Sequence, residues 1–454
     1  ALKGGHIDTD AIDNSAGVDM SDHEVNIKIL LGSAIATGAL GQQERDPLLA
    51  QMAEDVAALV LRDNYLQGEA LSVAEARGPA GFDRQIRLTR DLERAGRLDR
   101  ALEFLPDDEA LAMRAAARRG LTRPELAVLL AYAKMSLDED LLASDLPDLP
   151  ELAGDLRDYF PPALRDRFAK QIAAHPLHRE ITATVVTNDL INRAGITFVH
   201  DMRARTGKSP AEIARAYRIV REVFELRAAW TNIEALDNRV GTAVQSEMLL
   251  DVSGLVEHAA AWLLRHDRLD LGHDVERLKP SIRELAGLLP TLLPDTDRAI
   301  ADERAGRLMA AKVPQRLANA IGGTPFLAAA LEIADLAERT LQPLERAARA
   351  YYAAGAHFAL GEMRAAARRL PAETAWQRQA VDNVVDDLFT LQAEIAHSAL
   401  QASLDGADPL AAWAKEREPA LAPAEAIAAE LRAGAAPDLA MLVVASRQLR
   451  QVLG

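Results

Sequence analysis

Residues 122–134 read Thr122-Arg123-Pro124-Glu125-Leu126-Ala127-Val128-Leu129-Leu130-Ala131-Tyr132-Ala133-Lys134, which is the pattern of a capped helix. Thr122 and Glu125 have capping-box spacing, in which each side chain bonds a backbone N–H at the helix start. Pro124 suits the first turn, because the N–H it lacks would have no helical partner there. Apolar residues then recur at intervals of three and four, which places them on one face of a helix: Leu126, Leu129, Leu130 and Ala133.

The same signals recur along most of the chain. Ser209 and Glu212 predict a second capping box and a helix from Pro210 to about Arg227, and Asp46-Pro47 predicts another helix start. Residues 240–265 predict one or two helices. Stops or breaks are expected at glycines and prolines: Gly120, Gly195, Pro290, Pro294, Pro343, Pro371 and Pro409. Strand-like alternation is nearly absent, so the predicted fold class is mainly α. Candidate boundaries lie at residues 78–81, 145–150 and 269–280.

Composition narrows the classes of function. The 454 residues are 49% hydrophobic, carry a net charge of −16 and include no cysteine. A negative field repels phosphate backbones, so nucleic-acid binding is not expected. Without cysteine there are no disulfides or thiolate metal sites, which fits an intracellular compartment. No stretch has the roughly 18 consecutive apolar residues that span a membrane, and no secretory signal is apparent. We therefore expect a cytoplasmic protein without membrane contact.

Histidines and carboxylates offer few metal sites. Asp22-His23-Glu24 contains three potential ligands, but adjacent helical residues point in different directions, so we expect a polar helix start and no metal. His175 and His178 flank a proline and are better explained by a helix junction.

Three further motifs have structural explanations beside functional ones. Gly322-Gly323 has no preceding strand and no following lysine, which favours a helix stop and restart over a phosphate loop. Asp237-Asn238-Arg239 fits capping and surface pairing between two helices. A polar stripe on an otherwise apolar helix could line an interface or a ligand cleft, or its side chains could bond nearby backbone: Thr184, Thr187, Asn188, Asn192 and Arg193.

The N-terminal stretch, residues 4–26, is dense in small and polar residues. Asn14 to Val18 predicts a turn, in which Gly17 would let backbone approach a ligand. Ser21 is expected just before a helix that runs to about Leu31. Backbone N–H groups at a helix start, together with a hydroxyl, suit a carboxylate, although Ser21 as a plain N-cap is the simpler explanation.

The segment Asn14-Ser15-Ala16-Gly17-Val18-Asp19-Met20-Ser21 resembles the motif Asn-Ala-Gly-Gly-Val-x-x-Ser of the glutamate dehydrogenase family. Residues 4–30 are more similar still to one branch, the large bacterial NAD-dependent glutamate dehydrogenases. The resemblance extends through residues 121–134, 186–198 and 236–240, and covers about residues 1–270 with specific strings. Two positions depart from it: Ala16 replaces a glycine, and Asp19 adds a negative charge near an anionic substrate.

The resemblance implies roles for four residues. Asn14 would lie beside the nicotinamide of NAD, with Gly17 also on the cofactor. Val18 would pack on the aliphatic part of the substrate, and Ser21 would bind the distal carboxylate of glutamate. Catalytic Lys and Asp residues and a glycine-rich NAD-binding unit precede this motif in the family, and none occurs in this chain.

The resemblance also implies an organisation. Residues 1–44 would be the last piece of an α/β nucleotide-binding catalytic domain, followed by helical lobes at 45–270 and 271–454. With its upstream catalytic half, in a homo-oligomer, the protein would convert L-glutamate to 2-oxoglutarate, and this chain alone would be inactive. The alternative is a helical regulatory or oligomerisation module without chemistry.

Overall fold

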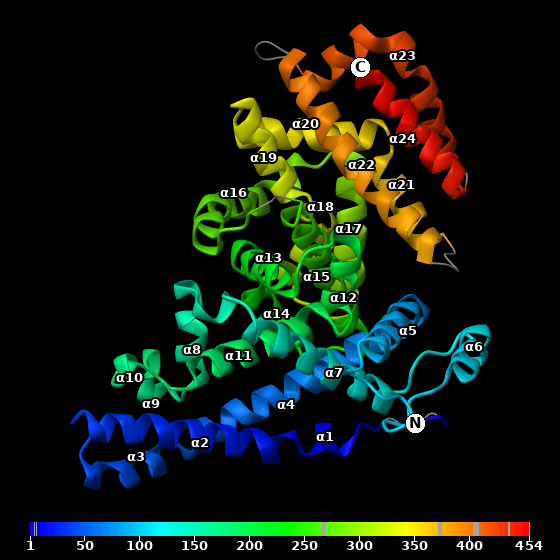
Figure 1. Cartoon of the computed structure of the whole chain (residues 1–454). Coiled ribbons are helices and arrows are strands. Elements are labelled where there is room, and N and C mark those ends of the chain that lie inside the picture. Colours follow the sequence, from blue (N-terminus) through cyan, green and yellow to red (C-terminus); the bar gives the residue numbers. More distant parts are fainter. Residues whose placement is uncertain are drawn as a thin grey trace. The chain divides into compact units, whose positions relative to one another are not determined.

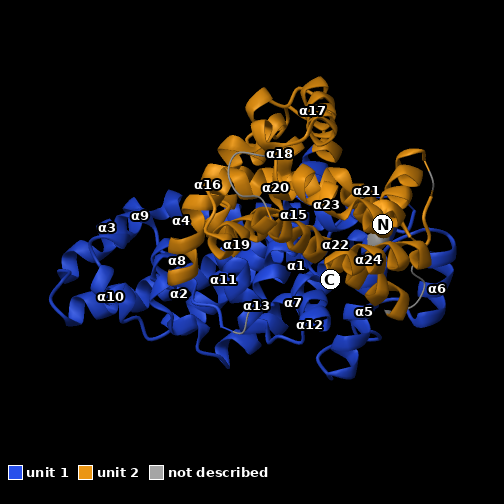
Figure 2. Cartoon of the chain, turned by 90° about the horizontal axis from the view of Figure 1, so that it is seen from above, with its two compact units in different colours: residues 1–219, 245–272 blue, residues 220–244, 273–454 orange. Residues whose placement is uncertain are grey.

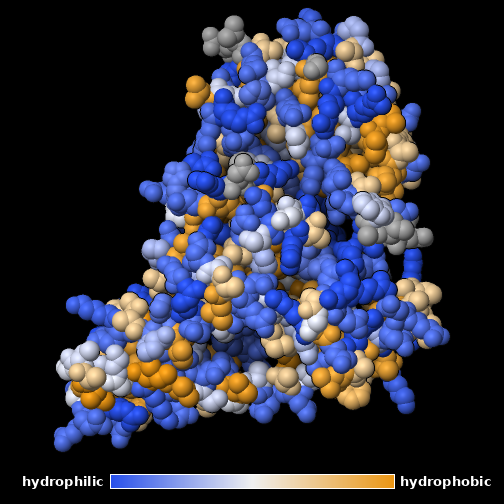
Figure 3. Space-filling model, viewed as in Figure 1, coloured by the Kyte–Doolittle hydropathy of each residue, from blue (hydrophilic) through white to orange (hydrophobic). Residues whose placement is uncertain are grey.

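The fold is helical throughout the computed structural model (Figure 1), which describes residues 1–3, 5, 7–265, 268–370, 375–402, 408–434 and 436–453. These ranges contain no strand, so the predicted mainly α class is confirmed. The expected break at Pro371 lies outside them, as do Gly4 and His6. Hydrophilic residues cover most of the face shown in Figure 3, with apolar side chains gathered in patches among them.

The chain forms two compact units, coloured separately in Figure 2. Unit 1 comprises Ala1–Ile219 and Gln245–Gly272, and unit 2 comprises Val220–Val244 and His273–Gly454. The stretches at residues 78–81 and 145–150, considered as boundaries from sequence, both lie inside unit 1. The first forms the opening turn of a helix and the second forms short 3₁₀ turns.

Unit 1 contains the α-helices of the first part of the chain, with one end each of α13 and α15 falling in unit 2. They are α1 (Asp10–Asp13), α2 (Ser15–Ala36), α3 (Arg45–Gln51), α4 (Ala53–Ala76), α5 (Gly78–Arg94), α6 (Asp108–Ala116), α7 (Arg123–Leu142), α8 (Ala153–Tyr159), α9 (Pro162–Arg165), α10 (Ala169–Ala173), α11 (His178–Ala194), α12 (Phe198–Thr206), α13 (Pro210–Val223) and α15 (Thr242–Leu263). Three 3₁₀ helices join them: η1 (Gln42–Glu44), η2 (Leu146–Asp148) and η3 (Pro150–Leu152).

Unit 2 contains the remaining helices, several of them long. They are α14 (Leu226–Glu234), α16 (Leu271–Leu292), α17 (Asp295–Ala310), α18 (Gln315–Leu327), α19 (Ala330–Thr340), α20 (Leu344–His357), α21 (Leu360–Arg369), α22 (Ala375–Ala402), α23 (Pro409–Arg432) and α24 (Leu439–Leu453). Among the described helices none is by itself long and apolar enough to cross a membrane. Within the described ranges, only α18 and α19 taken together, bent by 57°, have that length and composition.

Both predicted capping boxes are present. At the start of α7 the Thr122 N–H donates to Glu125 at 2.7 Å, and Thr122 in turn accepts from the backbone of Glu125. At the start of α13 the Ser209 N–H donates to Glu212 at 2.9 Å, and the Glu212 N–H donates to Ser209 Oγ at 3.3 Å. Gly195, with φ at +110°, ends α11 as predicted.

Other predicted helix boundaries are wrong. The helix that begins at Pro210 ends at Val223, not Arg227, because Glu225 has φ at +52° and starts α14 in a new direction. The helix expected to stop at Gly120 already ends at Ala116, and Arg118, with φ at +53°, takes the left-handed position after it. Pro290 lies within α16, two residues before its end, so it does not end the helix.

The glycine pair 322–323 does not interrupt a helix, which corrects the predicted stop and restart. Both residues lie inside α18. A Cβ atom on Gly322 would lie 2.6 Å from the carbonyl oxygen of Ala301 in α17, and one on Gly323 would lie 2.8 Å from Leu289. Gly322 is therefore needed for close packing, since α17 could not approach α18 past a larger side chain, whereas the tip of Leu289 can move away from residue 323.

This packing predicts opposite effects for two glycine substitutions. Gly322→Ala should lower the free energy of unfolding by about 1–3 kcal/mol, because the backbone of α17 must move away. Gly306→Ala, in α17, should raise it by about 0.5–1 kcal/mol, since a Cβ there meets nothing within 4 Å and alanine favours helix. Denaturant titration of both variants measures the difference. Equal stability of the two would contradict the packing role.

Candidate functional site

Asn14 is the one residue between α1 and α2, with φ at −116°, and α2 begins immediately after it at Ser15. The predicted turn from Asn14 to Val18 is therefore wrong beyond its first residue. Ser21 lies a turn and a half inside α2 and does not precede a helix. Its hydroxyl donates to the Val18 carbonyl at 2.7 Å. The helix extends this far because no residue between Ser15 and Ser21 is a strong breaker, glycine costing only about 1 kcal/mol.

The four residues assigned to substrate and cofactor share the exposed face of α2. Asn14, Gly17, Val18 and Ser21 are spaced by three and four, and the Val18 side chain is 68% exposed. Val25, one turn further, is 51% exposed and continues the same face. This face can present a carboxamide, an open backbone and a hydroxyl to a ligand, but it does not by itself enclose one.

Side chains from distant helices fix the start of α2. The Asn64 amide, on α4, donates to the Ile12 carbonyl at 2.8 Å and to Ser15 Oγ at 2.9 Å. Arg123, the first residue of α7, donates to Asp8 at 2.6 Å. Sequence reasoning missed both anchors, because neither has a local signal.

The opposite face of α2 is buried against α8 and α10. The ring of His23, only 1% exposed, stacks on Tyr159 with centroids 4.4 Å apart. The Asn26 amide donates to the Tyr159 hydroxyl at 2.9 Å. Further along α2, apolar residues of the helix pack in one buried core with apolar residues of segment 156–172. This core includes the following residues: Ile27, Leu30, Leu31, Ala34, Leu156, Phe160, Leu164, Phe168 and Ile172.

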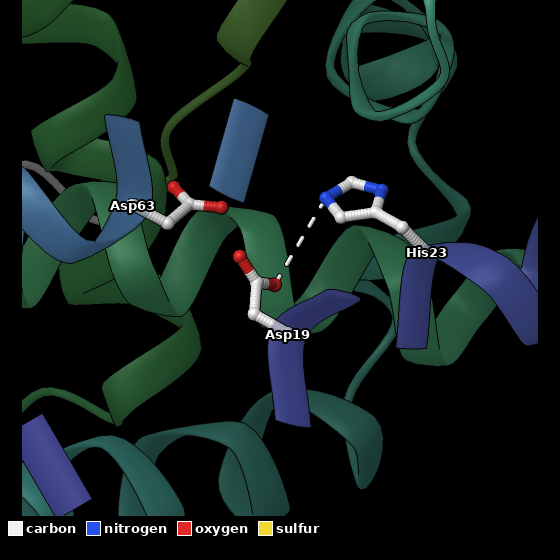
Figure 4. Close-up of side chains that lie close together, drawn as sticks. All are labelled: Asp19, His23 and Asp63. Atoms are coloured by element: carbon white, nitrogen blue, oxygen red, sulfur yellow. Dashed lines mark ion pairs between the residues drawn. The ribbon is translucent and has the colours of Figure 1, made fainter. Parts of the chain in front are cut away.

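Three ionisable side chains meet beside this buried face and form what we call the Asp19 cluster: Asp19, His23 and Asp63. Asp19 and His23 lie one turn apart on α2, and Asp63 comes from α4, which runs alongside (Figure 4). His23 Nε2 lies 3.9 Å from Asp19 Oδ1. One ligand atom from each residue lies within 4.8 Å of the others.

Burial dominates the electrostatics of the cluster. It raises the pKa of Asp19 to about 7, aided by the charges of Asp63 and Asp22 and opposed by Lys134. It lowers the pKa of His23 to about 4 and raises that of Asp63. Lys134, on α7, has its pKa lowered by burial to about 8. Near neutral pH the cluster thus combines a neutral imidazole with one carboxyl that is only partly ionised.

For Asp22-His23-Glu24, the predicted divergence of the three side chains is correct, but the predicted place at a helix start is wrong. The three side chains do diverge, with Asp22 and Glu24 exposed and Glu24 bonded to Lys28. However, they lie in the second and third turns of α2, and His23 is buried. The sequence does contain a signal for this arrangement, because Asp19 and His23 are four residues apart and so lie on one side of a helix.

Two other motifs have structural roles. His175 and His178 lie at the predicted junction of α10 and α11, where His175 contacts the Asn26 carbonyl at 3.1 Å. In the polar stripe of α11, Arg193 bonds Glu69 of α4 at 2.6 Å and Thr184 bonds Asp138 of α7 at 3.3 Å. For these two the stripe makes contacts between helices of unit 1, not bonds to nearby backbone.

The raised pKa of Asp19 predicts a pH-dependent stability. Between pH 3.8 and about 7 the folded chain holds a proton that the unfolded chain has released, so stability falls as pH rises through that range. Asp19→Asn removes this loss. Its stability relative to the unaltered chain should rise by roughly 1–3 kcal/mol from pH 5 to pH 8. The opposite titration of His23 is present in both proteins and cancels.

Denaturant titration in a chelating buffer at the two pH values measures this difference. Asp22→Asn is the matched control, because it removes an exposed charge three residues, or about one helical turn, from Asp19. It should show a much smaller pH-dependent gain. A gain for Asp19→Asn that is the same at both pH values would contradict the assigned pKa.

The segment that contains α2 matches a known protein family. Residues 1–74 match the family model of the bacterial NAD-glutamate dehydrogenase catalytic domain. An NAD-specific glutamate dehydrogenase of Pseudomonas aeruginosa is 41% identical over 454 residues, which are 99% of this chain and 28% of that protein. The NAD-specific glutamate dehydrogenase of Mycobacterium tuberculosis is 33% identical, again over 99% of this chain and 28% of the relative.

A third NAD-specific glutamate dehydrogenase, from Halomonas elongata, is 39% identical over 89% of this chain and 25% of its own length. The chain thus spans little more than a quarter of the curated relatives it matches. Residues 118–451, most of the chain, match the family model of the glutamate dehydrogenase C-terminal region. The chain belongs to this glutamate dehydrogenase family.

Proposed function

We propose that this chain is the C-terminal part of an NAD-dependent glutamate dehydrogenase. The intact enzyme would convert L-glutamate, NAD and water to 2-oxoglutarate, ammonium, NADH and a proton. The observation that carries the proposal is the match of residues 1–74 to a catalytic-domain family, in relatives named NAD-specific glutamate dehydrogenases. Those residues contain the exposed face of α2 with Asn14, Gly17, Val18 and Ser21.

In this proposal the exposed face of α2 forms one wall of the catalytic cleft. Asn14 lies beside the nicotinamide, and the lack of a side chain at Gly17 keeps the Asn14 amide in place, since a Cβ there would come within 3.1 Å of its oxygen. Val18 packs on the aliphatic part of glutamate. Ser21 turns its hydroxyl from the Val18 carbonyl to the distal carboxylate, where a hydrogen bond to a charged acceptor is stronger.

The chemical step requires groups that this face does not supply. Hydride transfer from the glutamate Cα needs the cofactor and substrate held in a fixed geometry, and NAD supplies the hydride acceptor when bound. We assign the catalytic Lys and Asp and the glycine-rich NAD loop to an upstream part of the same protein. The exposed apolar side chains on this face of α2 favour contact with that part: Val18 68% and Val25 51% exposed.

Activity assays separate this proposal from its alternative. Glutamate-dependent NADH formation is expected from the chain joined to its upstream part and not from the 454 residues alone. Activity of the isolated chain would refute the assignment of the catalytic residues to an upstream part of the protein. Inactivity of the joined protein, with its fold verified by circular dichroism, would instead leave a helical regulatory or oligomerisation module.

Substitution of Ser21 tests the binding role in the active enzyme. Ser21→Ala should lower kcat/KM for glutamate by about 10- to 100-fold, mainly through KM, because it removes a hydrogen bond to a carboxylate. The KM for NAD should change little. Ser33→Ala, on the same helix, is the matched control and should behave like the unaltered enzyme. If Ser21→Ala changes glutamate kinetics no more than Ser33→Ala does, Ser21 does not bind substrate.

A further inference from the structure

We propose that Asp19, His23 and Asp63 form a binding site for a first-row divalent transition metal ion such as Zn²⁺. The ion would join α2 to α4 on the side of α2 that faces away from Asn14, Val18 and Ser21. The site does not depend on the dehydrogenase proposal, because it rests only on side chains within unit 1.

The three side chains converge from two neighbouring helices. Asp19 and His23 are separated by four residues on α2, a spacing that directs both side chains to one side of the helix. Asp63 approaches from α4 and faces them (Figure 4). Their ligand atoms lie within 4.8 Å of one another. One ion bonded at about 2.0–2.2 Å would bring such atoms to roughly 3–3.5 Å apart, so the three side chains would draw closer together on binding.

His23 is the observation that distinguishes this cluster from an ordinary group of acids. Its side chain is 1% exposed, yet neither ring nitrogen has a hydrogen-bond partner. Asp19 Oδ2 is also buried without a partner. Buried polar atoms are nearly always paired, because desolvation without a partner costs about 1–3 kcal/mol per group. A metal ion at this position would bond one of the two imidazole nitrogens and the carboxylate oxygen.

The ligand types and charges fit a transition metal ion. Imidazole with two carboxylates suits Zn²⁺ and its neighbours better than Ca²⁺ or Mg²⁺, which prefer oxygen ligands alone. The two carboxylates would also balance the charge of a divalent ion at this partly buried position.

Lys134 is the competing cation. Its charge lowers the pKa of both Asp19 and Asp63. In the described part of the chain, however, its ammonium makes no ion pair with either carboxylate within 4.0 Å, and neither ring nitrogen of His23 has a hydrogen-bond partner. A divalent ion would contact all three side chains at once, which the single lysine does not.

The test is direct binding of Zn²⁺ to the full 454-residue chain stripped of metal by a chelator. Equilibrium dialysis should show one saturable site per chain. Co²⁺ in place of Zn²⁺ should develop visible d–d absorption with the intensity of nitrogen and oxygen coordination, which loose surface binding would not produce. This spectrum is read on the unaltered protein, so it does not depend on any variant folding.

Variants identify the ligands. His23→Gln and Asp63→Asn should each weaken Zn²⁺ binding about tenfold or more and reduce the Co²⁺ spectrum. Asp63→Asn keeps the size of the side chain and guards against a folding failure at buried His23. Asp22→Asn is the matched control, since it removes a nearby exposed charge, and its affinity should stay within about threefold. Absence of a saturable site, or equal binding by His23→Gln, Asp63→Asn and Asp22→Asn, would overturn the proposal.

Discussion

The burial of one face of α2 is the constraint on which the candidate site depends. The stacking of His23 on Tyr159, the Asn26 bond to the same tyrosine and the apolar contacts around Ile27 leave the helix one rotation about its axis. That rotation decides what is exposed. If Asn26 and His23 face the core, Asn14, Val18 and Ser21 must face outward, because the two sets are about half a turn apart on a helical period of 3.6 residues.

The helical class, the two capping boxes and the Gly195 stop could be predicted from sequence because each depends on residues within one turn of chain. Thr122 and Glu125 find each other whatever surrounds them. The predictions that failed involved competition between local and distant forces. A turn over Asn14 to Val18 is locally reasonable, but Asn64 of α4 holds the chain at Ile12 and Ser15, so the helix begins earlier. At Gly322 the deciding contact is the backbone of another helix.

The site itself divides in the same way. Asn14, Gly17, Val18 and Ser21 could be singled out from sequence because they form one contiguous motif. Asp63 and Lys134 could not, since nothing in the spacing of residues 19, 63 and 134 signals that α4 and α7 bring them beside α2. For His23 the side chains that matter are not its neighbours in sequence but Asp19, one turn back, and Tyr159 of α8.

The two faces of α2 are encoded in a single run of residues, with members of one set lying between members of the other. A substitution on the exposed face can therefore leave the buried contacts in place. A change in length cannot. Adding or removing one residue between Ser21 and His23 would rotate everything beyond it by about 100°, so that the outward motif and the inward anchor could no longer both be correctly placed. The spacing of the two sets of residues along α2 should therefore be kept among related chains.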